Sequence, residues 1–355
     1  MFRLLLLLIS LPAWASDGEI HTNVSGYSYY SYVSNEDFKE SNSRLALNLS
    51  ASTDEIGTLS AQLSTHPLSA VQRLDLMIPL SVADRHQGGI NVGRLDKSSW
   101  FFSQIVESPG SMGVRYVPQS VYDEAFVASL SNFDGFQFFN TTFSESGDYR
   151  VTGRLSVGKP MMSKQEDIQK LMFDTTALAD DVELVGDYDS YAASIAINLI
   201  DTFEMFWEHT VYNAHFESVS AGDTPFEQAV VSKILAAEDP WLRTLRGGLR
   251  LSPNSVFRVT GEYYLSNFNT PSINGSGWMV LTDYCVDDSI LLFAGYGENA
   301  SDVTGLWSNS DAVVGVNYSV DDFFIVGEFH KLTGSSLTNS GKDEGSYVFT
   351  VGYEF

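Results

Sequence analysis

Arginine dominates the chemistry that this sequence can do, because seven arginines occupy the polar positions of segments in which polar and apolar residues alternate. They are Arg44, Arg73, Arg150, Arg154, Arg246, Arg250 and Arg258. The eight lysines, in contrast, fall between such segments or near their ends. A group of permanent positive charges on one face sets the ion preference of any aqueous space that the face lines.

Acidic residues share that polar face. They are Asp75, Glu204, Glu208, Glu262 and Glu328. Any single arginine therefore fits two interpretations, a structural ion pair or a group that meets dissolved solutes. For the arginines as a group we favour contact with solutes, because ion pairs in a wet environment contribute little stability.

No residue pattern predicts a catalytic centre. The six histidines, His21, His66, His86, His209, His215 and His330, are scattered and none belongs to a recognisable nucleophile motif. A hydrolase that pairs a serine with His209, which has the parity of the apolar face, is the alternative that we keep open. No spacing of acidic residues predicts a metal site, we expect no cofactor, and the single cysteine, Cys285, excludes an internal disulfide.

The N-terminus predicts export. Arg3 precedes the apolar run Leu4–Ile9, and Ala13-Trp14-Ala15 fits a signal-peptidase site. We therefore expect residues 1–15 to be a cleaved signal peptide and residues 16–355 to form one domain. The formal net charge of −25 becomes one unit more negative without Arg3, which argues against a nucleic-acid partner.

Alternation with a period of two residues, in segments of about 10 residues, predicts tilted transmembrane strands. We predict sixteen strands, near 20–34, 42–52, 57–65, 72–80, 88–95, 134–144, 148–157, 187–199, 203–215, 241–252, 255–265, 276–286, 289–297, 311–320, 322–333 and 346–355. Short polar turns alternate with long connections at 96–133, 158–186, 216–240, 266–275, 298–310 and 334–345. This layout predicts an all-β, antiparallel transmembrane barrel. We assign 121–131 to a loop, since a strand there would put long loops at both ends.

If the strands form a barrel in lipid, the cost of burying charge in lipid decides which side of the barrel wall the arginine side chains face. A charge that faces lipid at the bilayer midplane costs about 2–4 kcal/mol, so the seven arginines must face the lumen. Arg94 shares parity with the apolar residues Ile90 and Val92, so we expect it near a strand end or beyond a bulge.

The last strand ends Tyr347 to Phe355 with aromatic or apolar side chains on one face and an aromatic terminal residue. This ending resembles the last strand of bacterial outer-membrane barrels, in which the barrel-assembly machinery reads a sorting signal. The resemblance makes Tyr353 and Phe355 the residues of an assembly signal.

Two motifs carry a second resemblance. Asn91-Val92-Gly93-Arg94 leads into a long segment that contains Val117-Pro118-Gln119-Ser120-Val121-Tyr122-Asp123-Glu124. Together they resemble Gram-negative porins, a group that includes phosphate- and dicarboxylate-type relatives. Those proteins have sixteen strands, are usually trimers, and fold the third extracellular loop inward to narrow the channel. The resemblance implies constriction residues, which are Arg94, Arg115, Asp123 and Glu124. Glu107, an acidic residue of the same long segment, is a further candidate for the constriction. The family's charged stretch reads Trp100-Phe101-Phe102-Ser103-Gln104 here, so the resemblance names no solute.

The sequence thus predicts a non-enzymatic porin of the Gram-negative outer membrane for small hydrophilic solutes and ions, with a modest anion preference. The expected partners are outer-membrane lipid and lipopolysaccharide, the barrel-assembly machinery and two further copies of the chain in a homotrimer. The alternatives are a barrel lipid hydrolase and a non-conducting structural or adhesin barrel. Sixteen strands enclose too wide a space for side chains alone to fill, which favours the pore.

Overall fold

The computed structural model describes residues 21–34, 39–53, 57–65, 71–83, 85–96, 101, 132–160, 183–199, 202–220, 241–269, 272–301, 307–336 and 344–355. These residues form sixteen strands: β1 (His21–Ser34), β2 (Lys39–Thr53), β3 (Gly57–Ser64), β4 (Val71–Ala83), β5 (His86–Asp96), β6 (Asn132–Phe143), β7 (Tyr149–Pro160), β8 (Glu183–Leu199), β9 (Phe203–Ser220), β10 (Trp241–Leu251), β11 (Phe257–Asn269), β12 (Ser272–Cys285), β13 (Ile290–Ser301), β14 (Trp307–Val320), β15 (Phe323–Ser336) and β16 (Glu344–Glu354). Every strand predicted from the alternation is confirmed. The segment 121–131 lies outside the described residues.

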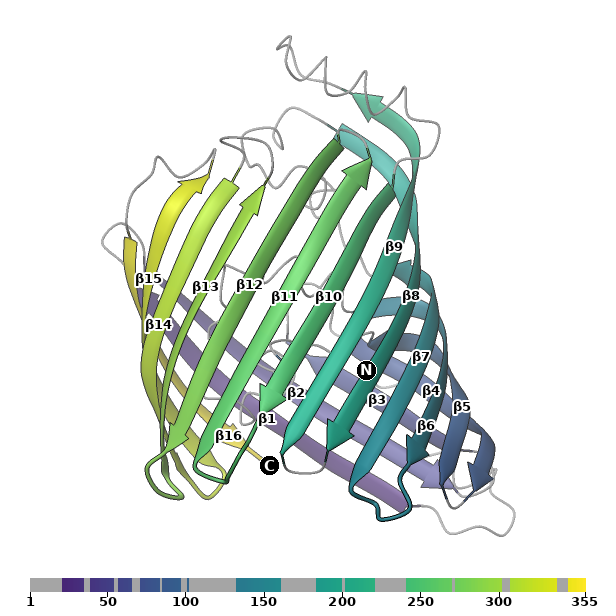
Figure 1. Ribbon diagram of the computed structural model, residues 1–355, viewed down its shortest axis with the longest axis horizontal. Coiled ribbons are helices and arrows are strands. Elements are labelled where there is room, and N and C mark those ends of the chain that lie inside the picture. Colours follow the sequence, from purple (N-terminus) through teal and green to yellow (C-terminus); the bar gives the residue numbers. More distant parts are fainter. Residues whose placement is uncertain are drawn as a thin grey trace.

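The strands form one closed antiparallel barrel in which each strand pairs with its neighbours in sequence (Figure 1). The circle closes between β1 and β16, where Tyr27 to Ser34 pair with Glu354 to Tyr347. Closure leaves no strand edge, so the backbone groups of the strands find partners within the sheet. Among the described residues, no helix has the length and apolar character needed to cross a membrane.

Connection lengths differ between the two rims. At the rim where the chain ends in Figure 1, β6 and β7, β10 and β11, and β14 and β15 are joined by short turns. The widest separations between strands, from β5 to β6 and from β7 to β8, fall at the other rim. This is the arrangement of outer-membrane barrels, with short periplasmic turns and long extracellular loops.

One long loop expected from the sequence is mostly strand. The segment 266–275 is rich in Ser, Asn, Gly and Pro, which predicts a loop, but β11 continues to Asn269 and β12 begins at Ser272. The backbone register pairs Ser266 with Gly275 and Asn267 with Asn274, and the two Asn side chains hydrogen-bond each other. Cross-strand pairing therefore overrides the turn preference of these residues.

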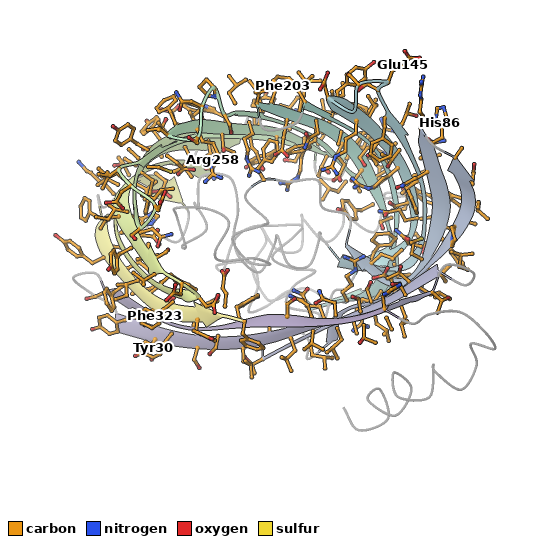
Figure 2. All side chains as sticks on the ribbon, turned by 90° about the horizontal axis from the view of Figure 1, so that it is seen from below. Tyr30, His86, Glu145, Phe203, Arg258 and Phe323 are labelled. Carbon is orange, nitrogen blue, oxygen red and sulfur yellow. The ribbon has the colours of Figure 1, made fainter. Side chains whose placement is uncertain are left out.

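The two faces of the barrel differ as expected for a barrel in lipid. The outer face exposes large apolar and aromatic side chains, such as Tyr30, Leu155, Trp207, Val314 and Phe349. Figure 2 shows Tyr30 pointing outward and Arg258 pointing into the lumen. The side chains on the same face as Arg258 are mainly polar or charged, and we call this face the inner face.

Candidate functional site

Register places six of the seven arginines on the inner face. Directly opposed residues of an antiparallel pair share a face, so positions can be traced from strand to strand. Thr260 lies two residues from Arg258 and pairs with Arg250, which pairs with Glu204. The same tracing through the other strand pairs shows that the inner face also carries Arg73, Arg150, Arg154 and Arg246.

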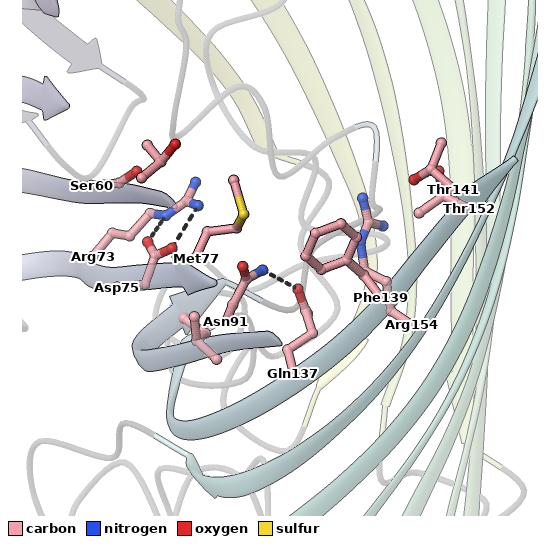
Figure 3. Close-up of a pocket in the computed structure, with 12 residues that line it drawn as sticks. Ser60, Arg73, Asp75, Met77, Asn91, Gln137, Phe139, Thr141, Thr152 and Arg154 are labelled. Carbon is pink, nitrogen blue, oxygen red and sulfur yellow. Dashed lines mark hydrogen bonds and ion pairs between the residues drawn. The ribbon is translucent and has the colours of Figure 1, made fainter. Parts of the chain in front are cut away.

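A first lumenal cavity of about 400 Å³ lies against β3 to β7 (Figure 3). Its charged lining residues are Arg73, Asp75 and Arg154. Arg73 donates to both carboxylate oxygens of Asp75, one of them at 3.3 Å. The side chain of Arg73 is 44% exposed, whereas that of Asp75 is 1% exposed. The pair therefore turns its positive member toward the cavity.

Neutral hydrogen-bonding groups fill the space between the two arginines. Asn91 Nδ2 donates to Gln137 Oε1 at 3.1 Å, and Gln137 Nε2 donates to Ser156 Oγ at 3.2 Å. In Figure 3, Arg73 and Arg154 lie on opposite sides of the Asn91–Gln137 pair. The cavity thus presents amide groups flanked by two guanidinium groups.

A second cavity of about 430 Å³ lies against the lower parts of β6 to β11, near the rim with short turns. Its charged lining residues are Arg150, Glu204, Arg250 and Arg258. Glu204 accepts from Arg250 at 3.0 Å and from Asn198 Nδ2 at 2.6 Å. Arg150 is exposed in this cavity, whereas the side chain of Arg250 is only 13% exposed.

Arg258 is tied to an acidic residue that the sequence analysis did not count. Its Nε donates to Asp283 Oδ2 at 2.7 Å, and the side chains of Arg258 and Asp283 are 25% and 2% exposed. Asp283 lies close to the end of its strand, where parity alone does not reveal a lumenal position. As with Arg73 and Asp75, the guanidinium is the accessible member of the pair.

Arg246 differs from the other lumenal arginines because it is buried. It lies opposite Glu208 on β9, and the two residues are 2% and 1% exposed. Its guanidinium carbon is 5.5 Å from the centre of the Tyr264 ring. For Arg246 the structural interpretation is therefore the better one.

Phe101 was not predicted as a site residue, and it is the described residue that follows β5 most closely in sequence. Its ring meets the ring of Phe206 edge-on, with centroids 5.1 Å apart, and the guanidinium carbon of Arg250 lies 4.3 Å above it. Phe206 and Arg250 belong to the inner faces of β9 and β10. Phe101 is therefore buried against the inner face of β9 and β10.

Arg94 does not line the lumen, contrary to its proposed place in a constriction. It lies opposite Asp134, and its Nε and a terminal nitrogen donate to that carboxylate at 2.9 and 3.1 Å. Asp134 shares its face with the exposed Phe136, so the ion pair lies on the outer face near the strand end. The shared parity of Arg94 and Val92 in the sequence correctly indicated the outer face. The ion pair with Asp134 compensates the charge of an arginine that faces outward.

The remaining predicted constriction residues are not tested by the structure. Glu107, Arg115, Asp123 and Glu124 lie outside the described residues. The backbone of Arg44 pairs with that of Tyr29, but its side chain lies outside the described part.

His209 and His330 do not form the Ser–His pair of a hydrolase. His209 lies beside Trp207 on the outer face, and its cross-strand neighbours are Ala193 and Leu245 rather than serines. His330 is buried on the inner face between Asp311 and Glu328, at 3.3 and 3.0 Å from its two ring nitrogens. Both nitrogens are therefore engaged by carboxylates, which is not the arrangement of a general base beside a serine nucleophile.

Compared by sequence, the chain matches no known family profile and no characterised protein. Compared by structure, it is similar to the anion-selective porin from Comamonas acidovorans, with 11% identity, a TM-score of 0.60, and 95% of this chain and 100% of that chain covered. It is also similar to the trimer form of OmpT, an outer membrane protein of Vibrio cholerae, with 12% identity, a TM-score of 0.57 and coverage of 95% and 99%. OmpF of Salmonella typhi gives 12% identity, a TM-score of 0.58 and coverage of 94% and 97%. The chain therefore has the fold of the bacterial outer-membrane porins.

Proposed function

We propose that this protein is an outer-membrane pore through which small hydrophilic solutes and ions diffuse passively. The observation that carries the proposal is the contrast between the faces of the closed barrel, apolar outside and charged inside around two lumenal cavities. Apolar side chains on the outer face favour lipid, and a polar inner face is typical of a water-filled channel. The likeness to solved porins supports this function.

We further propose a modest anion preference. The acidic residues of the inner face are mostly buried, whereas Arg73 and Arg150 present their guanidinium groups to the lumen. A permeating ion interacts most strongly with charges that water does not separate from it, so accessible arginines outweigh buried carboxylates. The fold relative from Comamonas acidovorans is itself described as anion-selective.

A narrowing of the pore by the segment after β5 is also part of the proposal. The contacts of Phe101 with Phe206 and Arg250 support this narrowing, because Phe101 belongs to the segment and packs on the inner face. Glu107, Arg115, Asp123 and Glu124 are the proposed charged residues of this narrowing, and they would face the accessible arginines across it.

Conductance in planar lipid bilayers tests the pore. We expect purified protein to give discrete conductance steps, and a reversal potential in a potassium chloride gradient that favours chloride modestly. A protein that inserts but never conducts, at any voltage, would contradict the pore. Conductance with a strong potassium preference would contradict only the anion preference.

The alternatives make different predictions. A barrel hydrolase would release fatty acids from phospholipid vesicles, and a non-conducting adhesin barrel would give no current. The engagement of both His330 nitrogens by carboxylates and the neighbours of His209 speak against a Ser–His hydrolase among the described residues. Lipid hydrolysis by the purified protein would favour the enzyme.

A homotrimer is the proposed assembly, with an interface on β2 to β5. These four strands contain no Phe, Tyr or Trp, whereas each of the other strands contains at least one. Aromatic girdles form where a barrel meets the lipid headgroups, so a sector without aromatics is suited to protein contact. Its outer residues are aliphatic, such as Leu45, Leu49, Leu76 and Ile78. A trimer form is described for OmpT from Vibrio cholerae, which is a fold relative.

Export and assembly complete the proposal. Cleavage after Ala15 would leave Ser16 as the first residue, and N-terminal sequencing of membrane-extracted protein tests this. The barrel-assembly machinery would act on the last strand, which ends in Tyr353 and Phe355, and the exposed outer face would contact lipid and lipopolysaccharide.

A further inference from the structure

The ion pair of Glu204 and Arg250 in the second cavity has the opposite orientation to the other lumenal pairs. The side chain of Glu204 is 34% exposed, whereas that of Arg250 is 13% exposed. In the ion pairs that Arg73 and Arg258 form, the guanidinium is instead the accessible member. A solute in the second cavity therefore meets a carboxylate at this point of the wall.

An exposed guanidinium lies in the same row of residues, two strands away. Arg150 on β7 pairs with Asn198 on β8, and Asn198 pairs with Glu204 on β9. Arg150 is exposed in the cavity, and among the described residues no ion pair joins it to an acid. Neighbouring strands are about 4.8 Å apart, so the backbones of Arg150 and Glu204 are about 10 Å apart. The cavity thus offers one positive and one negative group to the same solute.

The side-chain amide of Asn198 lies between these two charges. Its Nδ2 donates to Glu204 Oε1 at 2.6 Å, which leaves its Oδ1 to accept a hydrogen bond. A peptide N–H is a donor of the kind that such an oxygen accepts. The wall therefore presents a guanidinium, an amide and a carboxylate in this order. A dipeptide with free termini carries the complementary groups in the same order, which are its carboxylate, its peptide bond and its ammonium group.

Phe143 adds an apolar surface beside Arg150. The two residues are directly opposed on β6 and β7, so both face the lumen. Phe143 is half-buried, and the rest of its surface contributes to the lining of the cavity. A side chain next to the carboxylate of the solute would lie against this ring, and an apolar side chain gains most from such a contact.

We infer that the second cavity binds a dipeptide that has free termini and an apolar C-terminal residue. Arg150 receives the carboxylate and Glu204 receives the ammonium group, both through charge-assisted hydrogen bonds, and Asn198 accepts from the peptide N–H. Two extended residues span about 7 Å, so a dipeptide with its terminal hydrogen bonds bridges the two charges. The volume of about 430 Å³ is within the range of small-molecule sites. The inference rests on the proposed function and deepens it, because it names a solute class for the pore.

Isothermal titration calorimetry of the purified, detergent-solubilised protein tests the site with glycyl-leucine and three analogues. N-acetyl-glycyl-leucine lacks the ammonium group, glycyl-leucinamide lacks the carboxylate, and free leucine lacks the peptide bond. We expect saturable binding of glycyl-leucine, and affinities for the analogues that are at least about tenfold weaker.

Each analogue can overturn one part of the inference. Equal binding of the acetylated dipeptide would overturn the role of Glu204 and make the cavity a site for simple carboxylates. Equal binding of the dipeptide amide would overturn the role of Arg150. Equal binding of leucine would overturn the requirement for two residues.

Two variants assign the charged contacts by comparing ligands within the same protein. In Arg150→Gln, glycyl-leucine and its amide should bind with equal affinity, because the group that distinguishes them is gone. In Glu204→Gln, glycyl-leucine and its acetylated form should bind equally for the same reason. The glutamine keeps an oxygen that can accept from Arg250. A preference that persists in either variant would show that another residue reads that terminus.

A third variant tests the apolar contact. Phe143→Ala should weaken glycyl-leucine binding and leave glycylglycine binding unchanged. The control is Arg243→Gln, which removes an arginine of the outer face whose guanidinium stacks on Trp241 and which should bind all ligands like the unaltered protein. If the three lumenal variants also bind glycyl-leucine like the unaltered protein, the cavity is not the site.

Conductance of the same preparation separates this inference from the proposed function. A protein that conducts but does not bind glycyl-leucine overturns the dipeptide site and leaves the pore. A protein that binds glycyl-leucine but does not conduct overturns the pore and leaves the site.

Discussion

Phe206 lies flat over Gly248 on the neighbouring strand, and the space for its ring exists only because residue 248 has no side chain. A Cβ at Gly248 would stand 2.1 Å from Cε1 of Phe206. The ring of Phe206 in turn supports Phe101, which also packs under Arg250. Gly248 thus makes room for the ring of Phe206, on which Phe101 packs.

Replacing this glycine should disturb the pore rather than the barrel. We expect Gly248→Val to displace Phe206, release Phe101 and give a larger and noisier single-channel current. Overpacking of this kind costs about 1–3 kcal/mol, which a barrel of this size should tolerate. The control is Gly153→Val, because a Cβ at Gly153 would meet nothing within 4 Å. An unchanged current for Gly248→Val in folded protein would contradict a role for the Phe101 contact.

Arg150 offers the cleanest test of the anion preference. It is exposed in the second cavity, and among the described residues no ion pair joins it to a buried acid. We expect Arg150→Gln to shift the reversal potential in a salt gradient toward potassium. The shift should be larger in 0.1 M than in 1 M salt, because the Debye length falls from about 10 Å to about 3 Å. Arg243→Gln on the outer face should leave the reversal potential unchanged, and an equal shift in both variants would show that the effect is not lumenal.

Removing Arg258 should cost stability, in contrast to removing Arg150. Asp283 is buried, and Arg258 is its ion-pair partner, so Arg258→Gln leaves a buried carboxylate without that partner. Such a change costs about 3–5 kcal/mol in free energy of unfolding. Urea unfolding in detergent or lipid should show this loss, and the double variant with Asp283→Asn should recover part of it. Equal stability of Arg258→Gln and Arg150→Gln would mean that water already solvates Asp283.

Sequence alternation was sufficient to predict the strands and the direction of most arginines, because lipid outside and water inside impose opposite demands on successive residues. Arg73, Arg154 and Arg258 follow this rule directly. Arg94 departs from it, since Asp134 provides a partner on the outer face. That partner lies 40 positions further along the chain, and only the register between β5 and β6 brings it close.

The cavities could not be predicted from the sequence for the same reason. The first cavity combines Arg73, Asn91, Gln137 and Arg154 from four strands, and their relative heights depend on register. Register shifts between Gln62 and Leu63 and near Pro79 displace β3 and β4 relative to β5. The sequence also does not show which arginines are buried. It therefore predicted the same lumenal role for Arg246 and Arg73, although only Arg73 is accessible.

Trimer formation through β2 to β5 should respond to a bulky aromatic on that sector alone. We expect Leu45→Trp to reduce the trimer to monomers in native gels or analytical ultracentrifugation, because an indole does not fit a packed aliphatic contact. Leu265→Trp on β11 is the matched control, since both leucines are exposed on the outer face. Loss of the trimer in both variants would argue for a general effect on the barrel, and a trimer that survives Leu45→Trp would place the interface elsewhere.

Closure of the barrel at the C-terminus provides the last prediction. Gly26 donates to the carbonyl of Phe355 at 2.7 Å and accepts from its backbone nitrogen at 2.9 Å. The Phe355 ring covers Gly26, since an added Cβ there would stand 2.8 Å from Cζ.

Deleting Phe355 should therefore remove both the closing hydrogen bonds and the aromatic terminus, whereas Phe355→Ala removes only the ring. If the ring is an assembly signal, Phe355→Ala should lower the amount of folded barrel in cells yet leave refolding in detergent intact, measured by heat-dependent gel mobility. Equal losses in cells and in detergent would assign Phe355 to closure alone, and Phe349→Ala, on the same outer face within β16, controls for loss of an exposed aromatic.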